Sequence, residues 1–473
     1  MSNDIAEIFS VSDNSYLEAP AGCGKTHLLI ECINFHCEER QLILTHTNAG
    51  VSSIRDKYKT LKSKKRVTIE TIAGFCLRFV KAYPVRSEVK IDSPNNDKDW
   101  TLIYNGMLKL LSYAFIPRIV KNSYKGVFVD EYQDCSKLQH RIIKDLQKII
   151  PVRIVGDPLQ SIFCFRKKDE ENIDWEMDVT KSFVKVGELN TPWRWINHGQ
   201  KEFGEWLITY VRPMLINNQA LDLSITPQNV ELVYCTGDPT KDSIAKQSKC
   251  LACLSDKSKK VIIIDKGVNI NQSISFSKRL SGRYTLIEKH DCEEVTECAQ
   301  KIDSANGINK LHVLMNHMID ICSNLIKAFP KALLNGKVPK RTKRIDVLNL
   351  YLKMQDRNLL TLLEIIENEK GINISRKEYF YDLKHSIRDW VNGHSTSITE
   401  ALCKRRERLS KFGRKTPSKG IGRTHLIKGL ECDVGIILNA DKFEAKELYV
   451  ALTRASEKLI IFTSRKDKYL NAS

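Results

Sequence analysis

A segment near the start of the chain has the composition of a phosphate-binding loop. It consists of Ala19, Pro20, Ala21, Gly22, Cys23, Gly24, Lys25 and Thr26. The glycines let backbone N–H groups turn toward an anion, the lysine supplies a positive charge for the β- and γ-phosphates, and the threonine hydroxyl is a ligand for Mg²⁺. Alanine stands where such loops usually begin with glycine. The alternative is an ordinary glycine-containing turn followed by a surface lysine.

Two further polar groups follow short apolar segments that are typical of buried parallel strands. Asp130 and Glu131 come directly after residues 125–129, and Gln160 lies shortly after residues 152–155. Because the carboxyl ends of parallel strands meet at one edge of a sheet, we expect these side chains beside the phosphate loop. There Asp130 would share Mg²⁺ with the loop threonine, Glu131 would polarise water, and Gln160 would sense the γ-phosphate. The pattern predicts hydrolysis of a nucleoside triphosphate; a solvated polar loop is the alternative for each site alone.

The elements that must position these groups alternate between strands and helices. Further strand-like segments occur at 434–438 and 459–462, so the sequence predicts an α/β protein with a second sheet. Between these two segments lies Arg454, predicted on a helix. An arginine that reaches a triphosphate from a second domain makes hydrolysis depend on domain closure. The alternative is an exposed arginine on a solvated helix face.

Composition and charge narrow the classes of protein and partner. The 473 residues include 75 Lys+Arg and 57 Asp+Glu, and the resulting net charge of +18 favours an acidic polymer as partner. The hydrophobic content of 42% excludes a disordered chain. No apolar run is long enough to cross a membrane and the start does not resemble a signal peptide, so we expect a cytoplasmic protein.

The fourteen cysteines are scattered along the chain without the spacing of a disulfide framework. We therefore expect free, reduced thiols. A metal site built from Cys250, Cys253, Cys292 and Cys298 is disfavoured, because a second close pair with the usual spacing is missing.

Taken in order from Ala19 to Ala455, these motifs resemble those of the UvrD/Rep-like superfamily 1A DNA helicases. The resemblance implies ATP and Mg²⁺ as ligands, and two RecA-like P-loop NTPase domains, each a parallel sheet flanked by helices with a small, mainly helical insertion. The first domain is predicted at 1–186, with its insertion at about 82–122. The second is predicted at 187–289 and 417–473, with a helical insertion at 290–416, where apolar residues recur at helical spacing.

Three further motifs carry nucleotide contacts by resemblance. The segment 189–194 implies that Trp193 lies under the adenine and that Arg194 contacts the γ-phosphate. The segments 425–431 and 449–455 imply Glu431 on the ribose and Arg454 as the arginine finger. The glutamine that usually reads adenine before the phosphate loop has no counterpart, because the first glutamine of the chain is Gln41.

The resemblance also implies a surface for single-stranded DNA, in which His46 replaces a base-stacking phenylalanine. The residues predicted to contact DNA are Thr45, His46, Thr47, Asn48, Thr71, Phe75, Phe163, Phe165, Arg166, His425 and Lys428. For Phe163 and Phe165 the alternative is a core aromatic pair. Basic clusters at 62–66, 337–344 and 404–408 fit a DNA track, and each alone is otherwise a solvated face.

Three functions stay open from the sequence. The first is an ATP-driven translocase or helicase that moves on single-stranded or partly unwound DNA, by resemblance from 3′ to 5′. The second is a DNA-sensing ATPase subunit that regulates an OLD-family nuclease partner with little unwinding of its own. In its short insertions, and in having only 19 residues after Arg454, the chain resembles the helicase-like subunit of the Gabija anti-phage defence system. The third is a degenerate P-loop scaffold without enzymatic activity, which would not need all the catalytic residues together.

Overall fold

The computed structural model describes residues 2–60, 67–91, 94, 97–162, 172–266, 270–288, 293–329, 344–412 and 417–470. The chain forms two compact units. The first comprises Met1–Asn229 and Glu444–Glu457, and the second comprises Val230–Phe443 and Lys458–Leu470. Each unit is built on its own six-stranded sheet.

The sheet of the first unit is parallel throughout, in the order β3-β2-β4-β5-β1-β6. Its strands are β1 (Ser15–Glu18), β2 (Gln41–Thr45), β3 (Val67–Thr71), β4 (Gly126–Val129), β5 (Val152–Gly156) and β6 (Val184–Glu188). The phosphate loop follows β1, the acidic pair follows β4 and Gln160 follows β5. The prediction that three polar strand ends share one parallel sheet is therefore confirmed.

Alternate residues of the central strands enter two separate cores. Leu42 and Leu44 of β2 pack on one face of the sheet, whereas Ile43 packs on the other. Val127 and Phe128 of β4 divide in the same way. Because successive side chains of a strand point to opposite faces, a sheet covered on both sides has near-continuous apolar strands.

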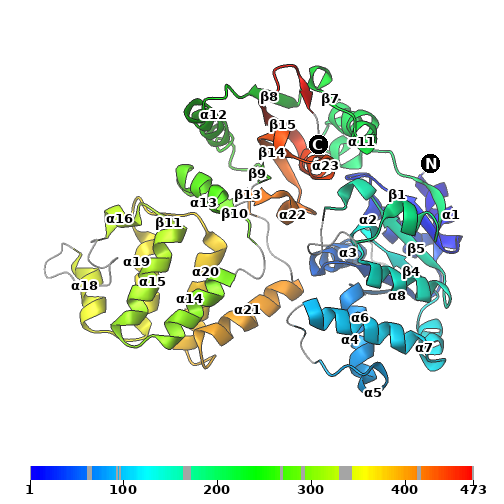
Figure 1. Ribbon diagram of the computed structural model, residues 1–473, viewed down its shortest axis with the longest axis horizontal. Helices are drawn as coiled ribbons and strands as arrows, with labels where there is room; N and C mark the ends of the chain where they lie inside the picture. Colours follow the sequence, from blue (N-terminus) through cyan, green and yellow to red (C-terminus); the bar gives the residue numbers. More distant parts are fainter. Residues whose placement is uncertain are drawn as a thin grey trace. The chain divides into compact units, whose positions relative to one another are not determined.

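Helices cover both faces of this sheet, and those between residues 84 and 123 correspond to the helical insertion predicted at about 82–122 (Figure 1). The helices of the first unit are α1 (Ser2–Val11), α2 (Lys25–Glu31), α3 (Asn48–Thr60), α4 (Ile72–Ala82), α5 (Pro84–Ser87), α6 (Asp97–Leu111), α7 (Phe115–Ser123), α8 (Lys137–Gln147), α9 (Trp193–Ile196), α10 (Lys201–Glu205), α11 (Arg212–Ile216) and α23 (Ala445–Leu452). A short strand, β7 (Leu221–Asp222), also lies in this unit. Apolar residues of α6 and α7 join the core on the Leu42 face, so the insertion packs on the domain rather than standing apart from it.

The second unit has a sheet in the order β10-β13-β9-β14-β15-β8, with the pairs β10–β13, β13–β9, β9–β14 and β15–β8 parallel. Its strands are β8 (Val230–Tyr234), β9 (Val261–Asp265), β10 (Thr285–Leu286), β13 (Lys419–Arg423), β14 (Cys432–Leu438) and β15 (Ala455–Thr463), of which β15 begins in the first unit. Helices α12 (Pro239–Ala252), α13 (Ile270–Arg279) and α22 (Thr424–Ile427) and the short strand β16 (Tyr469–Leu470) complete this part. Two parallel sheets flanked by helices confirm the predicted pair of RecA-like domains.

A helical subdomain is inserted between β10 and β13 of the second sheet. It contains α14 (Glu293–Ser304), α15 (Ile308–Ile321), α16 (Leu325–Ala328), α18 (Ile345–Leu352), α19 (Arg357–Asn368), α20 (Lys377–Val391) and α21 (Ile398–Phe412), with an antiparallel pair of short strands, β11 (Cys322–Ser323) and β12 (Asn373–Ile374). These helices bury one apolar core of their own, including Leu359, Leu362 and Leu363. The helical spacing in the sequence thus predicted the insertion, while the exact domain boundaries stay a prediction.

The described cysteines are free thiols, and most are buried. Among the described residues, no group of three or more histidine, cysteine, aspartate or glutamate side chains is arranged to hold a metal ion; Cys292 lies outside them. Within the same ranges, every helix is too short or too polar to span a lipid bilayer.

Thiol labelling of the native protein tests this burial. We expect N-ethylmaleimide to modify Cys403, which is exposed, much faster than Cys23 of the phosphate loop. Cys23 is 2% exposed and burial raises the pKa of its thiol to about 12, so little reactive thiolate forms at neutral pH. Peptide mass spectrometry would measure the two rates. Equal rates before unfolding would contradict the described packing of the loop, and equal rates after unfolding are the control.

Candidate functional site

The phosphate loop lies between β1 and α2, and its two glycines have backbone angles that other residues avoid. Gly22 has φ 73° and Gly24 has φ 90°. Space is also limiting, because a Cβ atom added to Gly22 would lie 2.6 Å from the ring of Trp195. The carbonyl of Gly22 accepts a hydrogen bond from the backbone N–H of Arg194 at 3.1 Å. The loop is thus shaped by its glycines and fastened to the segment that carries Arg194.

Lys25, the first residue of α2, is buried and points toward the acidic loop. Its Nζ lies 3.2 Å from the carbonyl oxygen of Ala19 and 3.3 Å from Oε1 of Glu131. Burial alone would lower the pKa of Lys25, but the charges of Glu131, Asp157 and Asp130 outweigh it, so the pKa is raised. The lysine therefore carries its positive charge inside the site.

The acidic pair follows β4 in a strained turn. Glu131 has φ 55°, a left-handed conformation that costs a non-glycine residue about 1–3 kcal/mol. The turn lets its backbone N–H donate to Oδ1 of Asp130 at 3.0 Å, while its carboxylate accepts from Nε2 of Gln133. Asp130 is 5% exposed, and burial together with the charge of Glu131 raises its pKa to about 7. Asp130 and the half-buried Thr26 supply hard oxygen donors of the kind that Mg²⁺ prefers.

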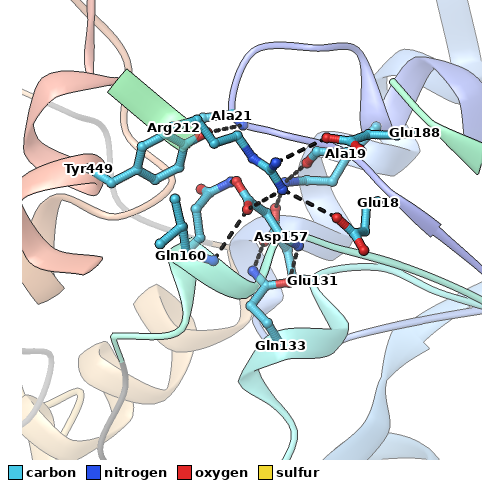
Figure 2. A network of polar contacts seen from close by, with 12 residues as sticks. Glu18, Ala19, Ala21, Glu131, Gln133, Asp157, Gln160, Glu188, Arg212 and Tyr449 are labelled. Atoms are coloured by element: carbon cyan, nitrogen blue, oxygen red, sulfur yellow. Dashed lines mark hydrogen bonds and ion pairs between the residues drawn. The ribbon is translucent and has the colours of Figure 1, made fainter. Parts of the chain in front are cut away.

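The loop after β5 is organised by Asp157, which the sequence analysis did not single out. Asp157 is fully buried, and its backbone N–H donates to Oε1 of Gln133 at 3.0 Å. Its Oδ2 accepts from Nε2 of Gln160 at 3.0 Å. Gln133 thus connects Asp157 to Glu131, and Asp157 sets the orientation of Gln160 (Figure 2).

Arg454 reaches Gln160 from the far end of the chain. Its Nη2 lies 3.5 Å from Oε1 of Gln160, and its Nε donates to the carbonyl of Val450 at 2.9 Å. The predicted position on a helix is wrong: α23 ends at Leu452, and Arg454 lies in the turn before β15. The Thr453 hydroxyl donates to the carbonyl oxygens of Tyr449 and Val450 in the last turn of the helix. The alternative of an exposed arginine is also wrong, because Arg454 is 2% exposed.

The segment that carries Arg454 is bonded both to the phosphate loop and to Arg194. The backbone N–H of Ala21 donates to the hydroxyl of Tyr449 at 3.3 Å, and Nη1 of Arg194 donates to the carbonyl of Thr453 at 2.6 Å. One network therefore joins Lys25, Glu131, Gln160, Arg194 and Arg454, with Gln133, Asp157 and Thr453 as links. Figure 2 shows the part from Glu131 through Gln133 and Asp157 to Gln160. Sequence reasoning missed Gln133, Asp157 and Tyr449 as members of this network, although Gln133 and Asp157 lie close in sequence to Glu131 and Gln160, and Tyr449 begins the segment 449–455.

The N-terminal part of the chain matches a known protein family. The family model of the UvrD/REP helicase N-terminal domain matches residues 3–108 and 93–179. The chain is similar to Gabija protein GajB of Bacillus cereus (strain VD045), at 22% identity over 97% of this chain and 95% of GajB. It also resembles the RecBCD enzyme subunit RecB of Buchnera aphidicola subsp. Schizaphis graminum, at 28% identity over 25% of this chain and 11% of RecB. The chain is related to the RecB/UvrD-type helicases.

Among solved structures, the chain is similar to arterivirus nonstructural protein 10, a helicase solved in complex with DNA. The alignment covers 98% of this chain at 10% identity, with a TM-score of 0.37. The alignment spans 64% of the arterivirus chain. The similarity in sequence to helicases identifies the chain as an enzyme of the helicase/ATPase class.

Two further residues, Trp193 and Glu431, are predicted to contact the nucleotide. Trp193 is 46% exposed, and a Cβ atom added to Gly24 would lie 3.3 Å from its ring, so its indole borders the phosphate loop. Glu431 is exposed and belongs to the second unit, shortly after α22. Its contact with the ribose stays a prediction, as does the contact of His425 and Lys428 with DNA.

The residues predicted to contact DNA differ in their burial and in the bonds that their side chains make. Thr47 and Thr71 use their hydroxyls to cap α3 and α4, accepting from the backbone N–H groups of Gly50 at 3.0 Å and Gly74 at 2.9 Å. Phe75 is fully buried with its ring centroid 4.9 Å from that of Phe79, so it has no surface for DNA and we withdraw it from the predicted contacts.

Other members of the predicted DNA surface lie near the acidic loop or outside the described residues. Thr45 is 2% exposed at the end of β2, Asn48 is half-buried, and Nε2 of His46 lies 3.3 Å from Sγ of Cys135. His46 thus connects the end of β2 to the segment after the acidic pair. The predictions for Phe163, Phe165 and Arg166, and for the basic cluster 62–66 and most of 337–344, lie outside the described residues.

A pair of glycine substitutions tests the geometry of the phosphate loop. Gly22→Ala and Gly199→Ala both place alanine at a similar positive φ, 73° and 70°, but nothing lies within 4 Å of a Cβ atom on Gly199. Both should lose about 1–2 kcal/mol of stability from the backbone conformation. Only Gly22→Ala should lose about 1–3 kcal/mol more, because its methyl group collides with Trp195.

Urea unfolding of the two variants and the parent chain would measure the difference, with Gly199→Ala as the matched control. Equal losses of stability in the two variants would contradict the close contact between Gly22 and Trp195.

Proposed function

We propose that the chain is an ATP-dependent DNA translocase or helicase of the UvrD/Rep type. It would hydrolyse ATP in the cleft between two RecA-like domains and move on single-stranded DNA from 3′ to 5′. The single observation that carries this proposal is the network that joins Lys25, Glu131 and Gln160 to Arg454 across more than 400 residues of sequence. A scaffold without catalysis would not need a lysine, a carboxylate, an amide and an arginine in one connected cluster.

In this proposal the loop residues 19–26 bind the phosphates, and Thr26 and Asp130 would hold Mg²⁺. A Mg²⁺ ion on a nucleotide needs few protein ligands, because phosphate oxygens and water supply the others. When bound, Mg²⁺ neutralises charge on the phosphates. Trp193 would stack on the adenine, and Glu431 of the second unit would contact the ribose.

The contact between Lys25 and Glu131 suggests how binding prepares hydrolysis. A triphosphate in the loop offers the Lys25 ammonium a stronger anionic partner than a single carboxylate does. We infer that Lys25 moves from Glu131 to the β/γ-phosphates, which leaves the Glu131 carboxylate to orient water and accept its proton. Gln160, Arg194 and Arg454 would then meet the γ-phosphate, where developing charge is stabilised by an arginine.

The DNA partner is supported by the relationship to helicases and by the net charge of +18. The contacts would come from the residues at the ends of β2 and β3, from Phe163, Phe165 and Arg166, and from His425 and Lys428. We propose that the protein acts in the cytoplasm.

ATPase assays with and without single-stranded DNA test the function. We expect DNA to stimulate turnover. Glu131→Gln should lower kcat about 10²–10⁴-fold because it removes the base, and Arg454→Ala should lower it about 10³-fold or more. Lys25→Ala should lose ATP binding. Lys148→Ala, which removes an exposed lysine paired with Asp145, is the matched control and should leave turnover unchanged. If the parent chain hydrolyses ATP at the same rate with and without single-stranded DNA, the proposed motor function is contradicted.

A second candidate is a DNA-sensing ATPase subunit of an anti-phage system. The observation that favours it is the similarity to Gabija protein GajB, which extends over nearly the whole length of both chains. In this case the ATPase would license cutting by a nuclease partner of the OLD family and would unwind little DNA itself. Purification from the native host distinguishes the two: a stoichiometric nuclease partner supports the sensor, and strong unwinding by the isolated chain supports the motor.

A further inference from the structure

Arg212 is a buried arginine that no predicted motif includes. It is the first residue of α11 and follows a π-helical stretch, Trp206–Val211, that continues from α10. Its side chain is 7% exposed and contacts the edge of the sheet below the phosphate loop. A charged side chain in such a place needs ionic partners, because an isolated buried charge is costly.

Three carboxylates surround the Arg212 guanidinium (Figure 2). Nη1 lies 3.0 Å from Oε1 of Glu188, and Nη2 lies 3.4 Å from Oε2 of Glu18 and 3.5 Å from Oδ1 of Asp157. Glu18 ends β1, Glu188 ends β6 and Asp157 directly follows β5. Since β5, β1 and β6 are neighbours in the sheet, one guanidinium holds together the ends of three adjacent strands.

The three carboxylates differ in what else they contact. Glu18 and Glu188 are also near the half-exposed Lys185, whose Nζ lies 2.9 Å from Glu18 and 3.8 Å from Glu188. Asp157 is fully buried, and its second oxygen accepts from Gln160, which in turn lies beside Arg454. Arg212 is therefore the cation through which the Gln160 loop is tied to the ends of the strands.

We propose that Arg212 is a positioning residue for ATP hydrolysis: it holds the Asp157 carboxylate in place, so that Asp157 orients Gln160 toward Arg454 and the γ-phosphate. This inference rests on the proposed ATPase function. Arg212 itself does not touch the nucleotide in this account. Its removal should therefore slow the chemical step rather than weaken the binding of ATP.

Steady-state ATPase kinetics of Arg212→Gln test the proposal. We expect kcat to fall about tenfold or more while KM for ATP changes about twofold or less, because the phosphate loop and Lys25 stay intact. Lys201→Gln is the control, since it removes one positive charge from an exposed position on α10, in the same helical run. An unchanged kcat in Arg212→Gln would overturn the proposal.

A double-mutant cycle separates positioning from general loss of structure. If Arg212 acts through Gln160, then Arg212→Gln in a Gln160→Ala background should not lower kcat further. Multiplied losses in the double variant would overturn the proposal, because they would show that the two residues act independently.

Should Arg212→Gln fail to fold, Arg212→Lys serves in the same cycle, because lysine keeps the charge but lacks the planar fork that spans three carboxylates.

A second check is rescue of the Arg212→Gln variant by a change at Asp157. In the Arg212→Gln background, Asp157→Asn removes the unpaired buried charge and keeps an acceptor for Gln160, so kcat should partly recover. Absence of recovery would contradict the role of Asp157. A parent chain that hydrolyses no ATP would overturn the proposed function and this inference together, whereas an active parent with an unaffected Arg212→Gln overturns only the inference.

Discussion

Negative charge buried at the carboxyl edge of the first sheet requires cations at fixed positions. Asp130 and Asp157 are almost entirely buried, and like charges repel strongly where water is excluded. Lys25 lies beside Glu131, and Arg212 lies beside Asp157. These internal ion pairs hold the three loops of the site together. We infer that a triphosphate competes with Glu131 for Lys25, so that binding and rearrangement of the site are a single event.

Much of this site is predictable from the sequence because parallel strands order it. The glycine-containing loop before Lys25, and the apolar strands before Asp130 and Glu131 and before Gln160, have strong local patterns. The parallel topology then brings the strand ends to one edge. The helical insertions are predictable for a similar reason, since their apolar residues recur at the helical period. No such rule gives the distance between Lys25 and Arg454, which depends on how the segment 444–457 packs.

The residues that sequence reasoning missed or misplaced act through tertiary contacts. Asp157 and Tyr449 lie inside recognised motifs, but their roles depend on partners from other elements. Arg212 does have a signal, a lone charge between Val211 and Pro213 in an apolar helical stretch, which suggests a buried ion pair. Phe75 shows that a motif position does not determine whether a side chain is exposed. Its motif implied a DNA contact, but the ring packs against Phe79 in the core.

A structure of the protein with a non-hydrolysable ATP analogue, Mg²⁺ and a single-stranded oligonucleotide tests the central claim most directly. The account predicts that Nζ of Lys25 has left Glu131 and that Lys25 and Arg454 both lie about 3 Å from oxygens of the terminal phosphates. An analogue bound in the loop with Lys25 still paired to Glu131, or with Arg454 turned away from the phosphates, would contradict it.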